Sequence, residues 1–352
     1  MIKLILLGLV AGAFFSSTFV LNELMSVAGG HWYWSASLRY VFMLILLTAI
    51  ITFQHGVQRI GELWQVFRRY WQFWCVTGGI GFGLFYAGIC YAADHASGWV
   101  VASTFMFTVV ASLFVLYAFG RRFDRQVIVY AVMIFIGVVC ANISEAMHTA
   151  TINTTVNTPA NPLIPSTEGL LQILLFGALP ALIAAFSYPI GNQLVWQASH
   201  NAAQRHNTAA TTSSAQLVSS WQRHIPTIDT ELLGNGVNNA FNKVWLMTLG
   251  SLPFWLLLGV LIHPNLPSMT QAFNTFLVAL CSGVIATSLF LYARGQADST
   301  QEVAGVDATQ ASEVIFALIG GVLLLGTPLP SLLGWIGIAL IVLGLVLFAV
   351  RQ

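Results

Sequence analysis

The sequence predicts an all-α integral membrane protein with about ten transmembrane helices, arranged as two inverted repeats of five helices. Three observations predict this fold. The composition is too apolar for a soluble domain, ten separate apolar runs are each long enough to cross a bilayer, and basic residues occur in alternate loops only.

The composition excludes water as the only solvent of the chain. Of 352 residues, 57% are hydrophobic and 7% are charged, and the mean hydropathy is +0.80. A soluble domain has about 25% charged residues. The net charge of +1 gives no basic excess for nucleic acid. The four cysteines, Cys75, Cys90, Cys140 and Cys281, lie in apolar runs at unrelated spacings, so no disulfide framework and no metal or cofactor site is expected.

Ten apolar runs match the length that a membrane helix needs, which is about 20 residues for a hydrocarbon core of about 30 Å. The predicted helices cover residues 4–27, 32–53, 73–93, 99–119 and 127–143, then 170–195, 243–262, 272–292, 303–325 and 332–350. The first run is interpreted as a retained helix and not as a cleaved signal peptide, because it exceeds a typical signal core and Lys3 alone precedes it.

The basic residues predict the orientation, since Lys and Arg concentrate in cytoplasmic loops. Twelve of the thirteen Lys and Arg residues fall at the amino terminus, in the loops after even-numbered helices or at the carboxyl terminus: Lys3, Arg59, Arg68, Arg69, Arg121, Arg122, Arg125, Arg205, Arg223, Lys243, Arg294 and Arg351. The exception, Arg39, lies within the second helix. Both termini are therefore predicted to be cytoplasmic, most simply at a bacterial inner membrane.

Two polar segments divide the chain. Residues 1–143 form the first five-helix repeat, residues 144–169 an external loop rich in Thr, Asn and Pro, and residues 170–352 the second repeat. The second repeat contains a polar segment at about 197–242, which is predicted to be a flexible cytoplasmic loop.

A weak internal repeat connects the halves. One ungapped offset places Tyr86 on Tyr292 and Ser103 on Thr309, and a second places Asn22 on Asn192. These matches align helices three, four and one with helices eight, nine and six. Five helices per half require opposite orientations in the membrane, and inverted repeats of this kind place a substrate site between the halves near the midplane.

Four segments resemble the drug/metabolite transporter superfamily, and within it the branch called putative multidrug resistance efflux transporters. They are the run from Phe15 to Val20, Ser37-Leu38-Arg39-Tyr40, the hairpin from Tyr91 into Thr104, and the run from Ala308 to Glu313. The resemblance covers both apolar halves and implies secondary transport of small molecules. Many relatives carry an acid toward the end of helices four and nine, where this chain has Phe114-Val115 and Gly320-Gly321.

Glu313 is the sharpest functional candidate, because a carboxyl group in the middle of a membrane helix is costly and usually marks a pathway or a proton relay. Thr309 and Gln310 precede it on the same side of the helix, and Asp307 is closer to the cytoplasmic end. We expect these residues to couple protons or bind substrate. The alternative is a protonated Glu313 that joins neighbouring helices by hydrogen bonds.

Glu23 and Arg39 form a second candidate, because counting along helices one and two places both near the external surface. We expect an ion pair between them that is either structural or part of an external gate. Residues predicted to line a cavity are Ser16, Phe19, Asn22, Tyr40, Tyr86, Phe107 and Asn192. Two small-residue pairs, Gly8 with Gly12 and Gly79 with Gly83, predict close helix packing.

No sequence signature of a soluble enzyme is present, since the chain lacks a phosphate-binding loop, a dinucleotide fingerprint and an HExxH run. The sequence therefore predicts a non-enzymatic secondary exporter of small organic solutes, with cationic or aromatic compounds favoured. Export or exchange of amino acids or other metabolites is the alternative within transport, and a membrane-embedded enzyme or a channel is the alternative class. The expected partners are a small-molecule substrate and lipid, and the expected state is a monomer or weak homodimer without nucleic acid.

Overall fold

The computed structural model describes residues 2–120, 125–157, 171–208, 225–228, 230–233, 237–297 and 300–351, and in these residues the only regular secondary structure is helix. Ten of the described helices are long and apolar enough to cross a membrane. Each lies on one of the ten predicted runs. The all-α fold class is therefore confirmed.

The first two spans of the first half are α1 (Ile2–Val27) and α2 (Trp32–His55). The third span joins α4 (Trp71–Gly78), a π-helical segment (Gly79–Leu84) and α5 (Phe85–Ala93). The fourth joins α6 (Gly98–Phe105) and α7 (Thr108–Ala118), and the fifth is α8 (Arg125–Asn157). The sixth and seventh spans are a π-helical segment (Ile173–Ala178) with α10 (Leu179–Thr208), and α12 (Val237–Ile262). The eighth span joins α13 (Met269–Val278), a π-helical segment (Ala279–Ala286) and α14 (Thr287–Gly295). The ninth joins α15 (Thr300–Ala308), a 3₁₀ turn (Thr309–Ala311), α16 (Ser312–Gly320) and a π-helical segment (Gly321–Leu325), and the tenth is α17 (Leu332–Arg351).

Five helical stretches occur where the sequence predicted loops: the ends of α8 and α10, the helix α3 (Val57–Arg69), the short helix α11 (Thr230–Leu233) and the first six residues of α12. α8 continues to Asn157 and α10 to Thr208, so the loops predicted at 144–169 and 197–242 are helical in their first parts. Neither of the stretches at the ends of α8 and α10 contains Gly or Pro, the residues least favourable in a helix interior. The helix α3 follows α2. Residues 158–169, 209–224, 229 and 234–236 of the predicted loops lie outside the described residues.

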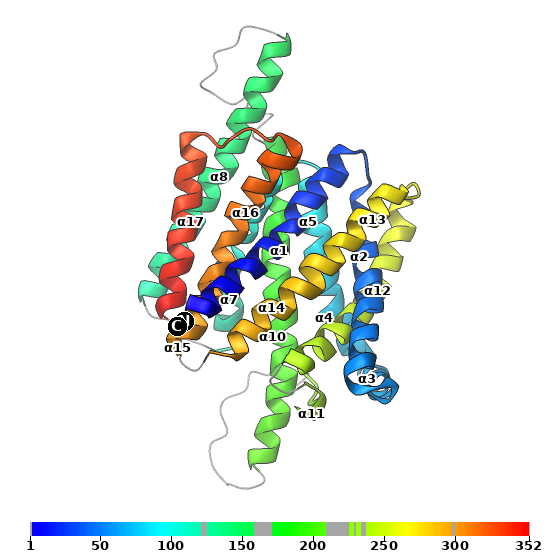
Figure 1. Cartoon of the computed structure of the whole chain (residues 1–352). Helices are drawn as coiled ribbons and strands as arrows, with labels where there is room; N and C mark the ends of the chain where they lie inside the picture. The colour runs from blue at the N-terminus through cyan, green and yellow to red at the C-terminus, as the bar shows by residue number, and fades with distance from the viewer. Residues whose placement is uncertain are drawn as a thin grey trace.

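Both ends of the chain lie at the same end of the helical bundle (Figure 1), as ten crossings require. The end of α8 extends beyond the bundle on the opposite side. α8 and α17 pack against each other as a pair at one edge, and α1 crosses the bundle obliquely beside α16. Which end faces the cytoplasm and the inverted relation of the two halves stay predictions.

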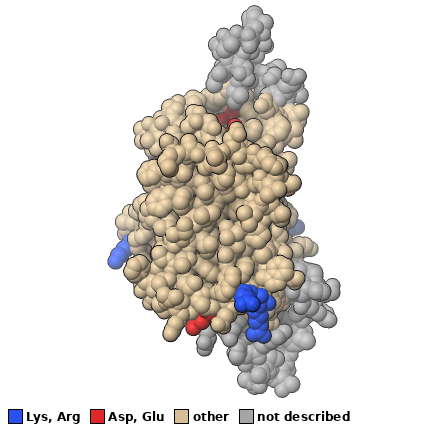
Figure 2. Space-filling model, turned by 90° about the vertical axis from the view of Figure 1, so that its right-hand side faces the viewer, with Lys and Arg blue, Asp and Glu red and all other residues tan. Residues whose placement is uncertain are grey.

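The outer surface of the bundle is apolar. Large hydrophobic side chains are exposed on every span, among them Leu6, Ile45, Phe114, Leu257 and Leu323. Figure 2 shows a broad area without charged side chains, with basic groups beside and below it and acidic groups near the top and the bottom of the molecule. Such a surface needs a lipid environment, so the protein is a multi-pass membrane protein.

Glycines permit the closest helix contacts. A Cβ on Gly8 would overlap Thr309 and one on Gly12 would overlap Ser312, so the first predicted glycine pair does pack α1 against the ninth span. Of the second pair, Gly83 lies against the ring of Phe254. The tightest approach joins backbones of α4 and α12, where a Cβ on Gly250 would overlap the carbonyl group of Trp74.

We predict that Gly250→Ala destabilises the protein, because an added methyl group must displace the backbone of α4. The expected cost is about 1–3 kcal/mol, as for overpacked cores. Gly61→Ala is the matched control, because Gly61 lies on the helix α3 with open space at its Cβ position and Ala favours a helix. The thermal midpoint of the detergent-solubilised protein should fall for Gly250→Ala alone; equal midpoints for both variants would contradict the contact.

Reporter fusions test the predicted orientation. Fusions after Arg125 and near Ser220 should report a cytoplasmic position, and a fusion near Asn157 an external position, because the basic residues lie in the loops of the first two. Activity of a cytoplasmic reporter and of a periplasmic reporter at each site is the measurement. An external position for the Ser220 fusion would overturn the predicted topology.

Candidate substrate cavity

A cavity of about 200 Å³ lies in the middle of the bundle, and residues from both halves of the chain line it. It is bordered by Phe15, Thr18, Phe19, Arg39, Tyr40, Met43, Phe82, Phe85, Phe105, Met106, Thr108, Tyr188, Asn192, Val244, Ser282, Gly283, Thr287, Gln310 and Glu313. Most of these positions are near the middle of their spans. The cavity therefore lies at the depth where an alternating-access transporter binds its substrate.

The helices that form the cavity depart from regular α-helix beside it. Phe82 belongs to the π-helical segment of the third span, and Ser282 to that of the eighth. Met106 lies at the break between α6 and α7, and Gln310 in the 3₁₀ turn before α16. Irregular backbone inside a membrane is tolerated where protein surrounds it, and π-helical segments occur frequently at functional sites.

Arg39 contributes a buried positive charge to the cavity. Its side chain is 7% exposed, and its Nη2 donates a hydrogen bond to Ser282 Oγ at 2.7 Å. Thr18 donates to the same hydroxyl oxygen at 2.6 Å. The guanidinium carbon lies 4.0 Å from the centre of the Tyr86 ring, a cation–π contact. Nε and Nη1 have no hydrogen-bond acceptor.

Glu313 contributes the carboxyl group. It lies in the first turn of α16, directly after the 3₁₀ turn, and is 8% exposed. Within the described part of the chain it forms no hydrogen bond, and no nitrogen of Arg39 lies within 4.0 Å of its carboxylate. Tyr188 is near enough to interact with it electrostatically. The cavity thus contains an acid and a base that are both buried and not paired with each other.

Aromatic rings form most of the remaining wall. The ring of Phe85 lies 5.3 Å from that of Phe105 and 5.1 Å from that of Tyr188. Tyr40 stacks on Phe82 at 5.3 Å. These rings offer apolar area and faces that attract cations, so the wall suits an organic solute with an aromatic or aliphatic part.

The structure brings part of the predicted site together. Of the predicted residues, Phe19, Arg39, Tyr40, Asn192, Gln310 and Glu313 line the cavity. The others lie outside it: Ser16, Glu23, Asn22, Tyr86, Phe107, Asp307 and Thr309. Tyr86 and Asn22 lie behind the wall, where Asn22 Nδ2 donates to the Tyr86 hydroxyl at 3.1 Å. Thr309 faces Gly8 on α1, where it contributes to packing.

The predicted ion pair between Glu23 and Arg39 is wrong. Glu23 Oε2 accepts a hydrogen bond of 2.7 Å from the backbone N–H of Gly98, the first residue of α6. It borders a second cavity, about 390 Å³, at the end of the bundle opposite the chain termini. Glu23 therefore caps a helix, where the positive end of the helix dipole stabilises a carboxylate, while Arg39 points to the central cavity.

Asp307 is likewise separate from the central cavity. Its carboxylate forms an ion pair of 3.2 Å with Arg294, which joins α15 to α14 near the chain termini. Both side chains are partly exposed. A solvated pair of this kind contributes little stability.

Thr18, Tyr188 and Ser282 are site residues that sequence reasoning missed. A hydroxyl group in a membrane helix usually bonds to its own backbone, as Ser17 does with Phe14, so Thr or Ser in an apolar run carries little information. The available signal for Thr18 was its place in the polar run from Phe15 to Val20 of α1, which carries part of the family resemblance.

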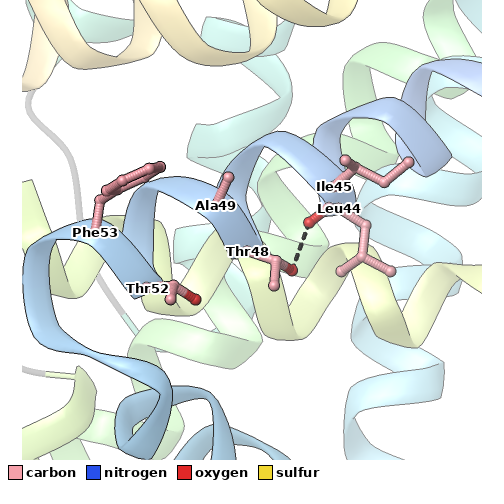
Figure 3. Close-up of a pocket in the computed structure, with 6 residues that line it drawn as sticks. All are labelled: Leu44, Ile45, Thr48, Ala49, Thr52 and Phe53. Atoms are coloured by element: carbon pink, nitrogen blue, oxygen red, sulfur yellow. Dashed lines mark hydrogen bonds between the residues drawn. The ribbon is translucent and has the colours of Figure 1, made fainter.

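A larger groove lies on the outside of α2, between Leu44 and Phe53, with a volume of about 480 Å³ (Figure 3). Its lining comes from one helix, and one of its two hydroxyl groups, Thr48 Oγ1, donates to Leu44 O at 2.6 Å. Trp245 Nε1 donates to Thr48 Oγ1 at 2.8 Å. Since these bonds satisfy Thr48 and the rest of the lining is almost wholly apolar, the groove is an uneven part of the lipid-facing surface.

Ten membrane spans around a central cavity with buried charged groups describe a multi-pass membrane protein. The chain belongs to the EmrE family of multidrug resistance efflux transporters, whose model, described as "Putative multidrug resistance efflux transporter", matches residues 2–352. Family membership confirms the resemblance found in the sequence and makes the protein a transporter and not an enzyme.

Two relatives and one solved structure show how far the similarity extends. The chain is 33% identical over 361 residues to "Uncharacterized protein YjlA" of Bacillus subtilis (strain 168), covering 98% of this chain and 94% of that protein. It is 31% identical over 303 residues to an "Uncharacterized 42.1 kDa protein in intracellular alkaline protease 3'region" of Shouchella clausii, covering 83% of this chain and 64% of that protein. A solved structure described as "Crystal structure of protein" matches with a TM-score of 0.52 at 15% identity, over 98% of this chain and 95% of that one. This last match shows the fold alone.

We predict that Glu23 and Arg39 act independently. Glu23→Ala should lower the thermal midpoint, because the Gly98 N–H loses its acceptor and a buried unsatisfied donor costs about 1–3 kcal/mol. Combining Glu23→Ala with Arg39→Gln should give the sum of the two single shifts. The control pair is Arg294→Gln with Asp307→Asn, whose side chains do touch. A combined shift clearly smaller than the sum for Glu23 and Arg39 would indicate a direct pair.

Proposed function

We propose that the protein is a secondary active exporter of small organic solutes, in which Glu313 binds the coupling proton or a cationic group of the substrate. The observation that carries this proposal is a buried carboxyl group without a hydrogen-bond or ion-pair partner on the wall of the central cavity. Burial without a partner is costly for a carboxylate. This cost is removed when the carboxylate takes up a proton or binds a cation.

Both halves of the chain contribute to the cavity, which supports alternating access. Arg39 and Phe82 come from the first half, and Ser282 and Glu313 from the second. If the halves rock against each other, the contacts across the cavity open first toward one side and then toward the other. The glycine contacts between α1 and the ninth span provide a smooth surface on which such movement costs little side-chain rearrangement.

The sequence supports an ion or substrate gradient as the energy source, because it contains no phosphate-binding loop. The aromatic wall favours a solute with an aromatic or aliphatic part. The volume of about 200 Å³ is below the roughly 300–1,000 Å³ of sites for drug-sized ligands. In this conformation the cavity therefore fits a small solute better than a large multi-ring compound.

We further propose that the protein resides in a bacterial inner membrane with both termini in the cytoplasm, as a monomer or weak homodimer. The distribution of the basic residues supports the orientation. Export or exchange of amino acids or other metabolites stays the alternative within transport.

We predict that Glu313→Gln inserts and folds but loses most transport and the pH dependence of what remains. Gln keeps the shape and hydrogen-bonding capacity of a protonated Glu but does not titrate. The groups beside Glu313 in the cavity are Arg39 and Tyr188. Glu313→Asp should retain part of the activity. The measurement is uptake into proteoliposomes between about pH 5.5 and 8.5, with a pH or counter-substrate gradient and no nucleotide.

Glu62→Gln is the matched control, because Glu62 is an exposed acid on α3 that pairs with Arg59. Its transport and pH profile should equal those of the wild type at the same reconstituted amount. A fully active Glu313→Gln protein with an unchanged pH profile would remove Glu313 from the mechanism. Strict dependence on ATP would overturn secondary transport itself.

A further inference from the structure

The central cavity contains two opposite charges that do not neutralise each other directly. Arg39 from α2 and Glu313 from α16 both line it, and each is more than nine-tenths buried. No ion pair joins them. When oppositely charged side chains share a small buried space, they normally form a pair with each other, because an unpaired buried charge is expensive. A space that keeps them apart is suited to a ligand that lies between them.

Arg39 has unused capacity to bind an anion. An arginine stays protonated in proteins, and its planar guanidinium group suits two parallel bonds to a carboxylate. Here Nη2 has one acceptor, Ser282 Oγ, whereas Nε and Nη1 have none. The Tyr86 ring covers one face of the guanidinium group. Both nitrogens are enclosed by protein in this conformation, so an incoming carboxylate would provide the missing acceptors once the guanidinium group turned toward the cavity.

A purely cationic substrate suits this cavity poorly. It would gain the carboxylate of Glu313 and the aromatic faces, but the fixed charge of Arg39 in the same 200 Å³ would repel it. A purely anionic substrate would gain Arg39 but would be repelled by the carboxylate of Glu313. A molecule that carries both charges satisfies both side chains.

We propose that the substrate is a small zwitterion of the amino-acid type. Its carboxylate binds Arg39, its ammonium group binds the carboxylate of Glu313, and its apolar side chain lies against the aromatic wall that includes Phe85 and Phe105. This inference rests on the proposed transport function and narrows its substrate class. The cavity volume fits one such molecule and excludes most larger ligands without further opening.

The test compares three molecules that differ in one charged group each: phenylalanine, phenethylamine, which lacks the carboxylate, and 3-phenylpropionate, which lacks the ammonium group. Proteoliposomes of the full chain are loaded with unlabelled phenylalanine, and the entry of labelled phenylalanine is measured against each compound as competitor. Wild-type protein should exchange phenylalanine, and the two single-charge analogues should compete about tenfold more weakly or worse, as expected for loss of a hydrogen bond to a charged group.

Arg39→Gln should remove the preference of phenylalanine over phenethylamine, so that the two compete within about threefold of each other. The control is Arg59→Gln, which removes a partly exposed arginine of α3 and should keep the wild-type order of competitors. If Arg39→Gln does not fold, the order of the three competitors on the wild-type protein decides alone.

The outcomes separate this inference from the function on which it rests. If phenethylamine or a permanently charged aromatic cation is transported in its own labelled form while phenylalanine is not, the zwitterion inference is wrong and the exporter proposal stands. If phenylalanine and phenethylamine compete equally on the wild-type protein, the carboxylate has no role and the inference is again wrong. If none of these compounds is transported under any gradient, both proposals fail.

Discussion

A backbone amide in the hydrocarbon part of a membrane has no water to bind, and the rest of this structure depends on that constraint. The chain meets it by forming helices, which satisfy their own N–H and C=O groups. Helices can then approach only as closely as their side chains allow. At Gly250 against Trp74, and at Gly191 against Gly81, even a methyl group is absent and the backbones touch. This close packing gives the bundle contact area without a hydrophobic driving force between helices.

The same constraint bears on the irregular backbone, part of which borders the cavity, although the π-helical segments Ile173–Ala178 and Gly321–Leu325 do not. A π-helical segment or a 3₁₀ turn leaves backbone groups less well paired, and lipid would not compensate for them. The departures at Phe82, Met106, Ser282 and Gln310 are enclosed by other helices and border the cavity. They also change the direction in which neighbouring side chains point, so that residues on several spans converge on one small volume.

The features of this fold that could be predicted from the sequence are those that one physical rule determines, and the features that could not be predicted depend on several rules at once. Length and hydropathy located all ten spans, because the thickness of the membrane fixes the length of a span and its apolar interior fixes the hydropathy. The ends of α8 and α10 were missed because polar residues without Gly or Pro continue a helix into water as readily as they form a loop. Glu313 could be predicted because a carboxyl group inside a membrane is conspicuous. The Glu23–Arg39 pair was wrong because counting residues gives the depth of a side chain but not its direction: Glu23 lies near the predicted end and accepts from Gly98, whereas Arg39 points into the central cavity. Ser282 could not be predicted, since a serine is inconspicuous until its partners are known.

The charges of the cavity also limit how transport can respond to a membrane potential. Arg39 is always positive, so the empty cavity is neutral when Glu313 is ionised and carries one positive charge when Glu313 is protonated. A bound zwitterion adds no net charge to either state, whereas a bound cation adds one. Moving one charge across the membrane is worth about 2.3 kcal/mol per 100 mV. Exchange of a zwitterion for a proton therefore moves one net charge per cycle, and exchange of a monovalent cation for a proton moves none. The unpaired arginine thus connects substrate class to electrical behaviour: the substrate that satisfies both side chains is also the one whose exchange for a proton the membrane potential can drive.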